Sequence, residues 1–246
     1  MNQLYQSSIV LLFALNLCVS SARGDIIVNG GFELGSSGTL KQGQVIRGGS
    51  LPGWVVDIVL GSNPQDFNVD LTAAGSWNHF EGQRSLDLEG SFSPGGTLQP
   101  GTLSGSISQI VASTIGQTYD LSFALGGNYF LNGTEPRQME VLWNDSSLGV
   151  YQHSLASGES WNSFTWDTHS LPISGNLVLG NDKLTFRSIT PAVDGHGAVL
   201  DSVSLTAVPE PSSGILLFAS SIAAMLVRRR RKGKGKKGKR GRSSLN

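Results

Sequence analysis

Two carboxylates lie close together in the segment Ser85-Leu86-Asp87-Leu88-Glu89-Gly90. Because side chains alternate between the two faces of a strand, Asp87 and Glu89 are expected on one face, about 7 Å apart. Such a pair could in principle hydrolyse a glycosidic bond. A solvated sheet face explains the pattern equally well, and we favour it. The four histidines lack metal-ligand spacing and no serine lies in a nucleophile elbow, so we expect no enzyme.

Aromatic residues suggest a second kind of chemistry, the binding of sugars. A flat ring stacks on the apolar face of a pyranose, with a few polar groups at the edges. The candidate ligand-binding residues are Trp77, Trp161 and Tyr129, and the polar surroundings of the two tryptophans predict that both are exposed. For any single ring, a structural role in the core is the alternative. Three other tryptophans have strand-like alternation and are expected in the core: Trp54, Trp143 and Trp166.

Short strands are the elements that must position these residues. Between residues 25 and 207, clusters of glycine and serine separate short alternating runs, and no amphipathic helix of a dozen residues is visible. This pattern predicts an all-β fold, a single antiparallel β-sandwich and most simply a jelly roll. The expected strands lie near residues 26–32, 54–59, 85–90, 106–111, 119–125, 139–143, 162–166, 183–187 and 198–205.

Charge divides the chain sharply. Residues 25–208 contain seventeen acidic and six basic side chains, a formal charge of −11, whereas eleven of the eighteen Lys and Arg residues lie between Arg228 and Arg242. An acidic domain repels phosphate and attracts divalent cations, so we expect no specific nucleic-acid partner.

The first residues predict export. Residues 9–17 are mostly apolar, and Ala22-Arg23-Gly24 places small residues where signal peptidase reads them, which predicts a signal peptide over residues 1–24. Cys18 also allows a lipoprotein signal, although Leu17 stands where that signal wants a small residue. If Cys18 is removed with the signal peptide, the exported domain has no cysteine and therefore no disulfide.

The C-terminal segment combines prolines, an apolar run and a basic cluster. Residues 208–211 read Val-Pro-Glu-Pro, residues 212–227 carry no charge, and residues 228–232 are all basic. As a helix, residues 212–227 would span roughly 24 Å, slightly less than the ~30 Å hydrocarbon core that they are predicted to cross. The basic residues predict that the tail, residues 228–246, stays in the cytoplasm. A buried amphipathic helix followed by a disordered tail is the alternative.

This order of parts resembles the PEP-CTERM sorting signal. The resemblance implies that an exosortase cuts near the sorting motif, Pro209, Glu210 and Pro211, and passes the protein to the cell surface. The tail beyond Lys232 is longer and more basic than the pattern needs. The resemblance thus implies two partners, an exosortase and the membrane.

A second resemblance covers residues 25–207. Segments such as Asn29-Gly30-Gly31-Phe32-Glu33, Gly82-Gln83-Arg84 and Val199-Leu200-Asp201-Ser202-Val203 resemble, in this order, the choice-of-anchor C family. They are also similar to plant cell-wall proteins with a domain of unknown function and, more distantly, to galactose-binding-like carbohydrate modules. The resemblance implies a galactose-binding-like jelly roll.

The related carbohydrate modules also imply a metal site. In them, calcium commonly ties the first strand to the last, and the matching residues here are Glu33 and Asp201. Calcium takes six to eight oxygen ligands, and the missing cysteines argue against zinc. The alternative is that Glu33 caps a turn and Asp201 faces solvent.

Together these patterns predict an exported protein of the cell surface or extracellular matrix that binds polysaccharide without catalysis. Two alternatives stay open: a structural component of an exopolysaccharide matrix without a discrete sugar site, and a glycoside hydrolase that uses Asp87 and Glu89. The expected domains are the signal peptide (1–24), the β-sandwich (25–207), the sorting motif (208–211), the transmembrane segment (212–227) and the basic tail (228–246).

Overall fold

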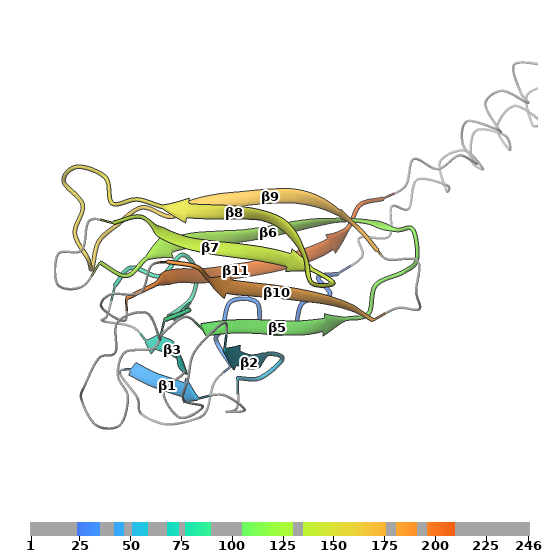
Figure 1. The fold of residues 1–246 in the computed structure, drawn as a ribbon, viewed down its shortest axis with the longest axis horizontal. Helices are drawn as coiled ribbons and strands as arrows, with labels where there is room; N and C mark the ends of the chain where they lie inside the picture. Colours follow the sequence, from blue (N-terminus) through green and yellow to red (C-terminus); the bar gives the residue numbers. More distant parts are fainter. Residues whose placement is uncertain are drawn as a thin grey trace, which may run out of the picture. The chain divides into compact units, whose positions relative to one another are not determined.

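The described part of the chain forms eleven strands in two antiparallel sheets. A computed structural model describes residues 24–34, 42–46, 51–58, 68–73, 77–89, 105–129, 135–175, 181–190 and 196–209. The first sheet has the order β1-β3-β4-β11-β6-β9 and the second β2-β5-β10-β7-β8. Figure 1 shows β5, β10, β7 and β8 of the second sheet running side by side. The strands are β1 (Gln42–Ile46), β2 (Val55–Ile58), β3 (Asn68–Ala73), β4 (Arg84–Asp87), β5 (Gly105–Val111), β6 (Thr118–Gly127), β7 (Arg137–Trp143), β8 (Ser146–His153), β9 (Asp167–Ser174), β10 (Asp182–Ser188) and β11 (Ala198–Ala207).

The core lies between the two sheets, as the alternating pattern predicts. Leu86 of β4 and Leu200 of β11 are fully buried in the same cluster as Ile107 of β5. The rings of Phe123 on β6 and Phe186 on β10 meet edge to face, 5.5 Å between centroids, and so join the two sheets directly. The predicted all-β antiparallel sandwich is confirmed.

Two predicted strands are absent where expected, and four observed strands were not expected. Residues 24–34 form turns, in which Asn29 and Phe32 have positive φ angles of 57° and 56°. Residues 160–163 also turn, because the backbone groups of Ser160 and Ser163 bond each other. Strands β1, β3, β8 and β9 were missed. The side chains of β8 and β9 are largely exposed, so these two strands give no clear alternation.

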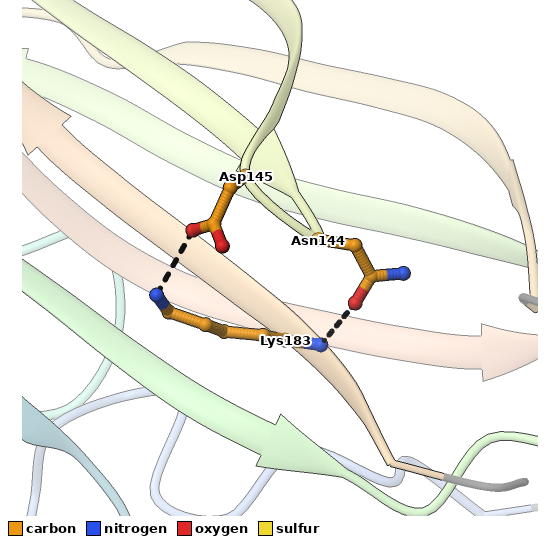
Figure 2. A network of polar contacts seen from close by, with 3 residues as sticks. All are labelled: Asn144, Asp145 and Lys183. Atoms are coloured by element: carbon orange, nitrogen blue, oxygen red, sulfur yellow. Dashed lines mark hydrogen bonds and ion pairs between the residues drawn. The ribbon is translucent and has the colours of Figure 1, made fainter. Parts of the chain in front are cut away.

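A tight turn joins β7 to β8 and is fastened to β10. Trp143 pairs with Ser146, so the turn has two residues, Asn144 and Asp145, with φ angles of 50° and 63°. Asparagine and aspartate tolerate this left-handed conformation, which two-residue hairpins require. Figure 2 shows the fastening: the backbone N–H of Lys183 donates to Asn144 Oδ1 (2.9 Å), and its Nζ pairs with Asp145 Oδ1 (2.9 Å).

The sandwich belongs to a compact unit, Arg23–Val208. Among the residues that the structure describes, no helix is long and apolar enough for a membrane span. The predicted signal peptide (apart from Gly24), transmembrane segment and basic tail lie outside the described residues, as do Glu210 and Pro211 of the sorting motif.

Gly30 lets the N-terminal turn pack against the last strand. A Cβ atom at this position would lie 1.8 Å from the backbone oxygen of Val203, whose N–H donates to the Gly30 oxygen at 3.0 Å. The backbone of Val203 leaves no room for a methyl group at this position.

Replacing Gly30 with alanine should therefore lower the free energy of unfolding by about 3 kcal/mol, because the turn must move away from β11. Gly116→Ala is the control: its φ is 72° and no atom lies near its Cβ position, so only backbone strain of about 1 kcal/mol is expected. Thermal unfolding of the purified full-length protein in detergent measures both. Equal losses for the two variants would contradict the close packing at Gly30.

Candidate functional site

Three of the sequence motifs meet at one loop, residues 77–83, which we call the aromatic loop. The carboxylate of Glu33 accepts the backbone N–H groups of Gln83 (2.7 Å) and Arg84 (2.9 Å) through Oε1. Asp201 Oδ2 accepts the N–H groups of Phe80 (3.0 Å) and Glu81 (3.2 Å). The N-terminal segment and the last strand therefore hold the same loop through two carboxylates.

Asp201 is a buried carboxylate at an irregularity of β11. The pairing of β11 with β6 shifts register between Asp201 and Ser204, and Ser202 has a positive φ of 50°. The residue is fully buried, and Ser202 N–H donates to its Oδ1 at 2.7 Å. Burial raises the pKa of Asp201 to about 7, although the backbone N–H donors act to lower it. The alternative in which Asp201 faces solvent is therefore wrong.

These two carboxylates are satisfied by N–H donors rather than by a shell of oxygens. Both oxygens of Asp201 and one oxygen of Glu33 accept backbone hydrogen bonds. Within the described ranges, no group of three or more His, Cys, Asp and Glu residues could hold a metal ion. Calcium takes six to eight oxygens, some of which can come from backbone carbonyls and water. Structural calcium at Glu33 and Asp201 stays a prediction.

Trp77 is not exposed, contrary to the sequence-based expectation. Its exposed fraction is 8%, and its ring packs against Phe164 with 6.4 Å between centroids. The indole Nε1 donates to Ser85 Oγ at 2.9 Å, so the polar neighbours that suggested exposure instead satisfy a buried ring. Trp77 anchors the aromatic loop to β4 and presents no surface for stacking.

Tyr129 is also buried. Its hydroxyl donates to the backbone oxygen of His153 at 2.7 Å and lies 2.9 Å from the same residue's Nδ1. The guanidinium of the buried Arg137 lies 5.2 Å from the centre of the ring. With an exposed fraction of 1%, Tyr129 packs inside the fold and is not an open platform.

Trp161 is half-buried in a loop that precedes β9. Glu159 closes this loop: its Oε1 accepts the N–H and the hydroxyl of Thr165 at 2.8 and 2.7 Å, and its Oε2 accepts Ala156 N–H at 2.8 Å. These hydrogen bonds, led by that from the Thr165 hydroxyl, lower the pKa of Glu159. Of the three predicted ligand-binding residues, Trp161 alone keeps a partly open ring.

The structure brings forward a pair of rings that the sequence did not suggest. Phe80 is 44% exposed, and its ring meets that of the half-buried Trp166 edge to face, 6.2 Å between centroids. We call Phe80 and Trp166 the aromatic pair. The indole N–H of Trp166 donates to Asn78 O at 2.8 Å, which fixes the ring. Trp166 was expected in the core; the Trp-Asn-His-Phe run at residues 77–80 was the available signal for Phe80.

The aromatic pair rests on a rigid base. Asn78 exchanges two hydrogen bonds with the backbone of Phe164, at 2.6 and 3.1 Å, and so joins the aromatic loop to the segment before β9. Gly126 on β6 lies below: a Cβ there would be 2.5 Å from the Phe164 ring and 3.1 Å from the Trp166 ring. A preorganised aromatic surface of this kind suits the apolar face of a sugar.

Asp87 and Glu89 do not line a solvated face, so that expectation is wrong. Their exposed fractions are 1% and 0%. Asp87 accepts Asn128 Nδ2 (2.8 Å) and the backbone N–H of Gly197 (3.2 Å), while Ser188 Oγ donates to Glu89 (2.7 Å). Residue 197 crosses close above them, since a Cβ there would lie 2.6 Å from Glu89 Cγ. Burial raises the pKa of the Asp87 carboxyl well above its usual value.

A family model confirms the predicted sorting signal. The PEP-CTERM protein-sorting motif matches residues 207–232, which indicates an exported, exosortase-processed surface protein. A search of curated proteins finds no match.

Several solved structures are similar in fold. An apo cyclase from Fischerella sp. is 17% identical with a TM-score of 0.51, over 77% of this chain and 98% of that chain. A Stig cyclase from Fischerella sp. TAU, in complex with (3Z)-3-(1-methyl-2-pyrrolidinylidene)-3H-indole, is 18% identical with a TM-score of 0.53, over 77% and 99%. A family 35 carbohydrate-binding module from Clostridium thermocellum is 14% identical with a TM-score of 0.37, over 68% of this chain and 98% of that chain. At these identities the likeness shows the fold alone.

The raised pKa of Asp201 predicts a pH dependence of stability. The Asp201 carboxyl binds its proton more tightly in the folded state, where its pKa is about 7, than in the unfolded chain, where its pKa is near 3.8. The contribution of protonated Asp201 to stability is therefore lost as pH rises from about 4 through about 7. Relative to Asp201→Asn, which cannot titrate, the wild type should become less stable between pH 5 and pH 8. Thermal unfolding of both proteins across this range measures the difference; a constant difference would contradict the raised pKa.

Thermal unfolding across the same pH range also tests the predicted calcium site at Glu33 and Asp201. A cation beside Asp201 would favour the charged carboxylate, so added calcium should raise the melting temperature more at pH 8 than at pH 5. Glu33→Gln should reduce this effect. Identical melting temperatures with calcium and with a chelator would remove the predicted site.

Proposed function

We propose that this chain is a surface or extracellular-matrix protein that binds polysaccharide without catalysis after sorting by an exosortase. The aromatic pair carries the proposal, because an exposed ring on a fixed base can stack on a pyranose at little entropic cost. Asn78, whose amide group is engaged with the backbone of Phe164, supplies the fixed base beneath the pair. Trp161 is a candidate second contact.

The alternatives receive less support. A glycoside hydrolase needs two carboxyl groups that reach the substrate and a water molecule, and Asp87 and Glu89 are both buried and engaged in hydrogen bonds. A purely structural matrix component needs no exposed ring on a fixed base, yet Phe80 is held outward. Membership of the choice-of-anchor C family fits the proposal but stays a prediction.

The sorting proposal assigns residues 212–227 to a transmembrane segment. In this view the acidic sandwich lies outside the cytoplasm, residues 228–246 lie inside, and cleavage near Pro209 releases the domain or transfers it to the surface. The basic tail is also suited to anionic lipid.

Phe80→Ala and Trp166→Ala should each weaken retention on a bound polysaccharide about tenfold, equal to about 1.4 kcal/mol, because each removes a stacking surface. Affinity electrophoresis of the full-length protein in detergent against a panel of polysaccharides measures retention. Val150→Ala is the matched control, since Val150 is 56% exposed on β8 of the other sheet. Trp161→Ala tests the second contact.

Near-ultraviolet circular dichroism separates lost contact from lost folding in these variants. If the folded double variant Phe80→Ala, Trp166→Ala is retained as strongly as the wild type, the aromatic pair does not bind the polysaccharide. Release of reducing sugar that disappears in Asp87→Asn would instead support the hydrolase.

Substituting Ala for Pro209, Glu210 and Pro211 together should block C-terminal processing, because the sorting enzyme would no longer find its motif. Mass spectrometry of the C-terminus of the protein from its native host measures this. The wild type should lack the basic tail and the variant should retain it. An intact tail in the wild type would contradict cleavage.

A further inference from the structure

The last strand ends in a set of hydrogen bonds directly before the sorting motif. Val208, the last residue of the compact unit, donates its N–H to Thr118 O at 2.9 Å, which continues the β11–β6 pairing one residue beyond Ala207. The buried side chain of Gln117 donates through Nε2 to Val208 O at 2.7 Å and to Thr118 O at 2.9 Å. Both backbone groups of Val208 are therefore engaged, and Pro209 is the next residue.

The turn that carries Gln117 is itself fixed to the first sheet. The N–H of Gln117 donates to Thr114 O at 3.1 Å, and its carbonyl accepts the N–H of Gly175, directly after β9, at 2.9 Å. The hydroxyl of Tyr119, a buried residue of β6, accepts the N–H of Thr114 at 2.7 Å. The donor to the Val208 carbonyl is therefore held in place by the starts and ends of two neighbouring strands.

The N-terminal segment occupies the other edge of β11. Asp25 Oδ1 accepts the N–H of Leu205 at 2.9 Å, and Ile26 N–H donates to Leu205 O at 3.1 Å. Near its end, β11 therefore has partners on both edges, β6 on one and the N-terminal segment on the other. A protease binds its substrate as an extended chain, so a cut before residue 208 requires the end of β11 to leave the sheet first.

The bond between Val208 and Pro209 is protected in a second way. A cut at this bond must attack the Val208 carbonyl, which is the acceptor of the hydrogen bond from Gln117. The leaving side is a proline, which has no N–H and a fixed φ angle. Pro209 itself is exposed, so the protected part of the chain ends at this residue.

Resting on the exosortase sorting proposed above, we propose that the sandwich sets the N-terminal limit of the sorting cut and that Gln117 is the positioning residue for this limit. The exosortase cuts on the C-terminal side of Pro209. The surface form therefore keeps all of β11 together with Val208 and Pro209. Gln117 acts by holding the Val208 carbonyl against the end of the first sheet.

The C-terminal residue of the mature protein from its native host tests the limit. Mass spectrometry should find mature chains that end at Pro209 or at a later residue. Mature chains of the wild type that end at Val208 or earlier would overturn the limit while leaving exosortase sorting intact. Protein that keeps its whole basic tail would instead refute the sorting on which the limit rests.

Gln117→Met tests the positioning residue, because methionine has a similar length but no donor. Elastase, whose small pocket accepts alanine, should cut the full-length protein in detergent after Ala207 about fivefold faster in this variant than in the wild type, since the strand end opens more often. Gln152→Met is the matched control, because Gln152 is exposed on β8 of the other sheet, and its rate should equal that of the wild type.

In the native host, Gln117→Met should add mature chains that end before Pro209, whereas Gln152→Met should not. Near-ultraviolet circular dichroism shows that each variant is folded. If the elastase rate of the folded Gln117→Met variant is unchanged, or if all its mature chains end at the wild-type residue, Gln117 does not set the limit.

Discussion

The hydrogen bonds between the Asp201 carboxylate and the backbone of the aromatic loop are the constraint on which the rest of the site depends. Asp201 sits on the last strand, yet its oxygens accept N–H groups from Phe80 and Glu81, 121 and 120 residues earlier in the chain. Buried N–H groups without an acceptor would be costly, so this carboxylate fixes where the loop can lie. Burial of Asp201 is the unfavourable side of the arrangement, and it appears as a pKa raised to about 7.

Preorganisation of the aromatic pair follows from this constraint. Phe80 leaves the loop at the residue whose N–H is held by Asp201, and Trp166 is fixed through its indole N–H on Asn78. The backbone at Phe80 and the ring of Trp166 are thus already fixed, which reduces one of the usual costs of binding. The backbone hydrogen bond to Asp201 therefore fixes the position of Phe80, whose side chain is partly exposed.

Much of the fold could be read from the sequence, whereas the site could be read only in part. Alternation at Leu86, Leu121 and Phe186 predicted core-facing strands, because burial on one face imposes period two. The edge strands β8 and β9 have largely exposed side chains, so their pattern carries no such signal.

For the site, the resemblance implied that Glu33 and Asp201 act together through calcium, which stays a prediction. The structure shows both carboxylates holding the aromatic loop through backbone N–H groups, which the sequence did not indicate. Exposure of single rings could not be read either. Trp77 and Trp166 differ in what covers them, and that depends on Asn78 joining two segments that are 86 residues apart. A polar residue near a ring in the sequence does not show whether the ring is exposed. Ser85 accepts a hydrogen bond from a buried indole, whereas Glu81 faces water.

The burial of Asp87 and Glu89 favours the proposed binding function over catalysis. Asp87 and Glu89 are covered by the backbone near residue 197 and hydrogen-bonded to Asn128 and Ser188, so reaching a polymer would require breaking a buried polar network. Phe80, by contrast, is already exposed beside the ring of Trp166. Since a long glycan meets only the surface of a folded domain, the exposed ring of Phe80 rather than the buried carboxyl groups is positioned to contact it.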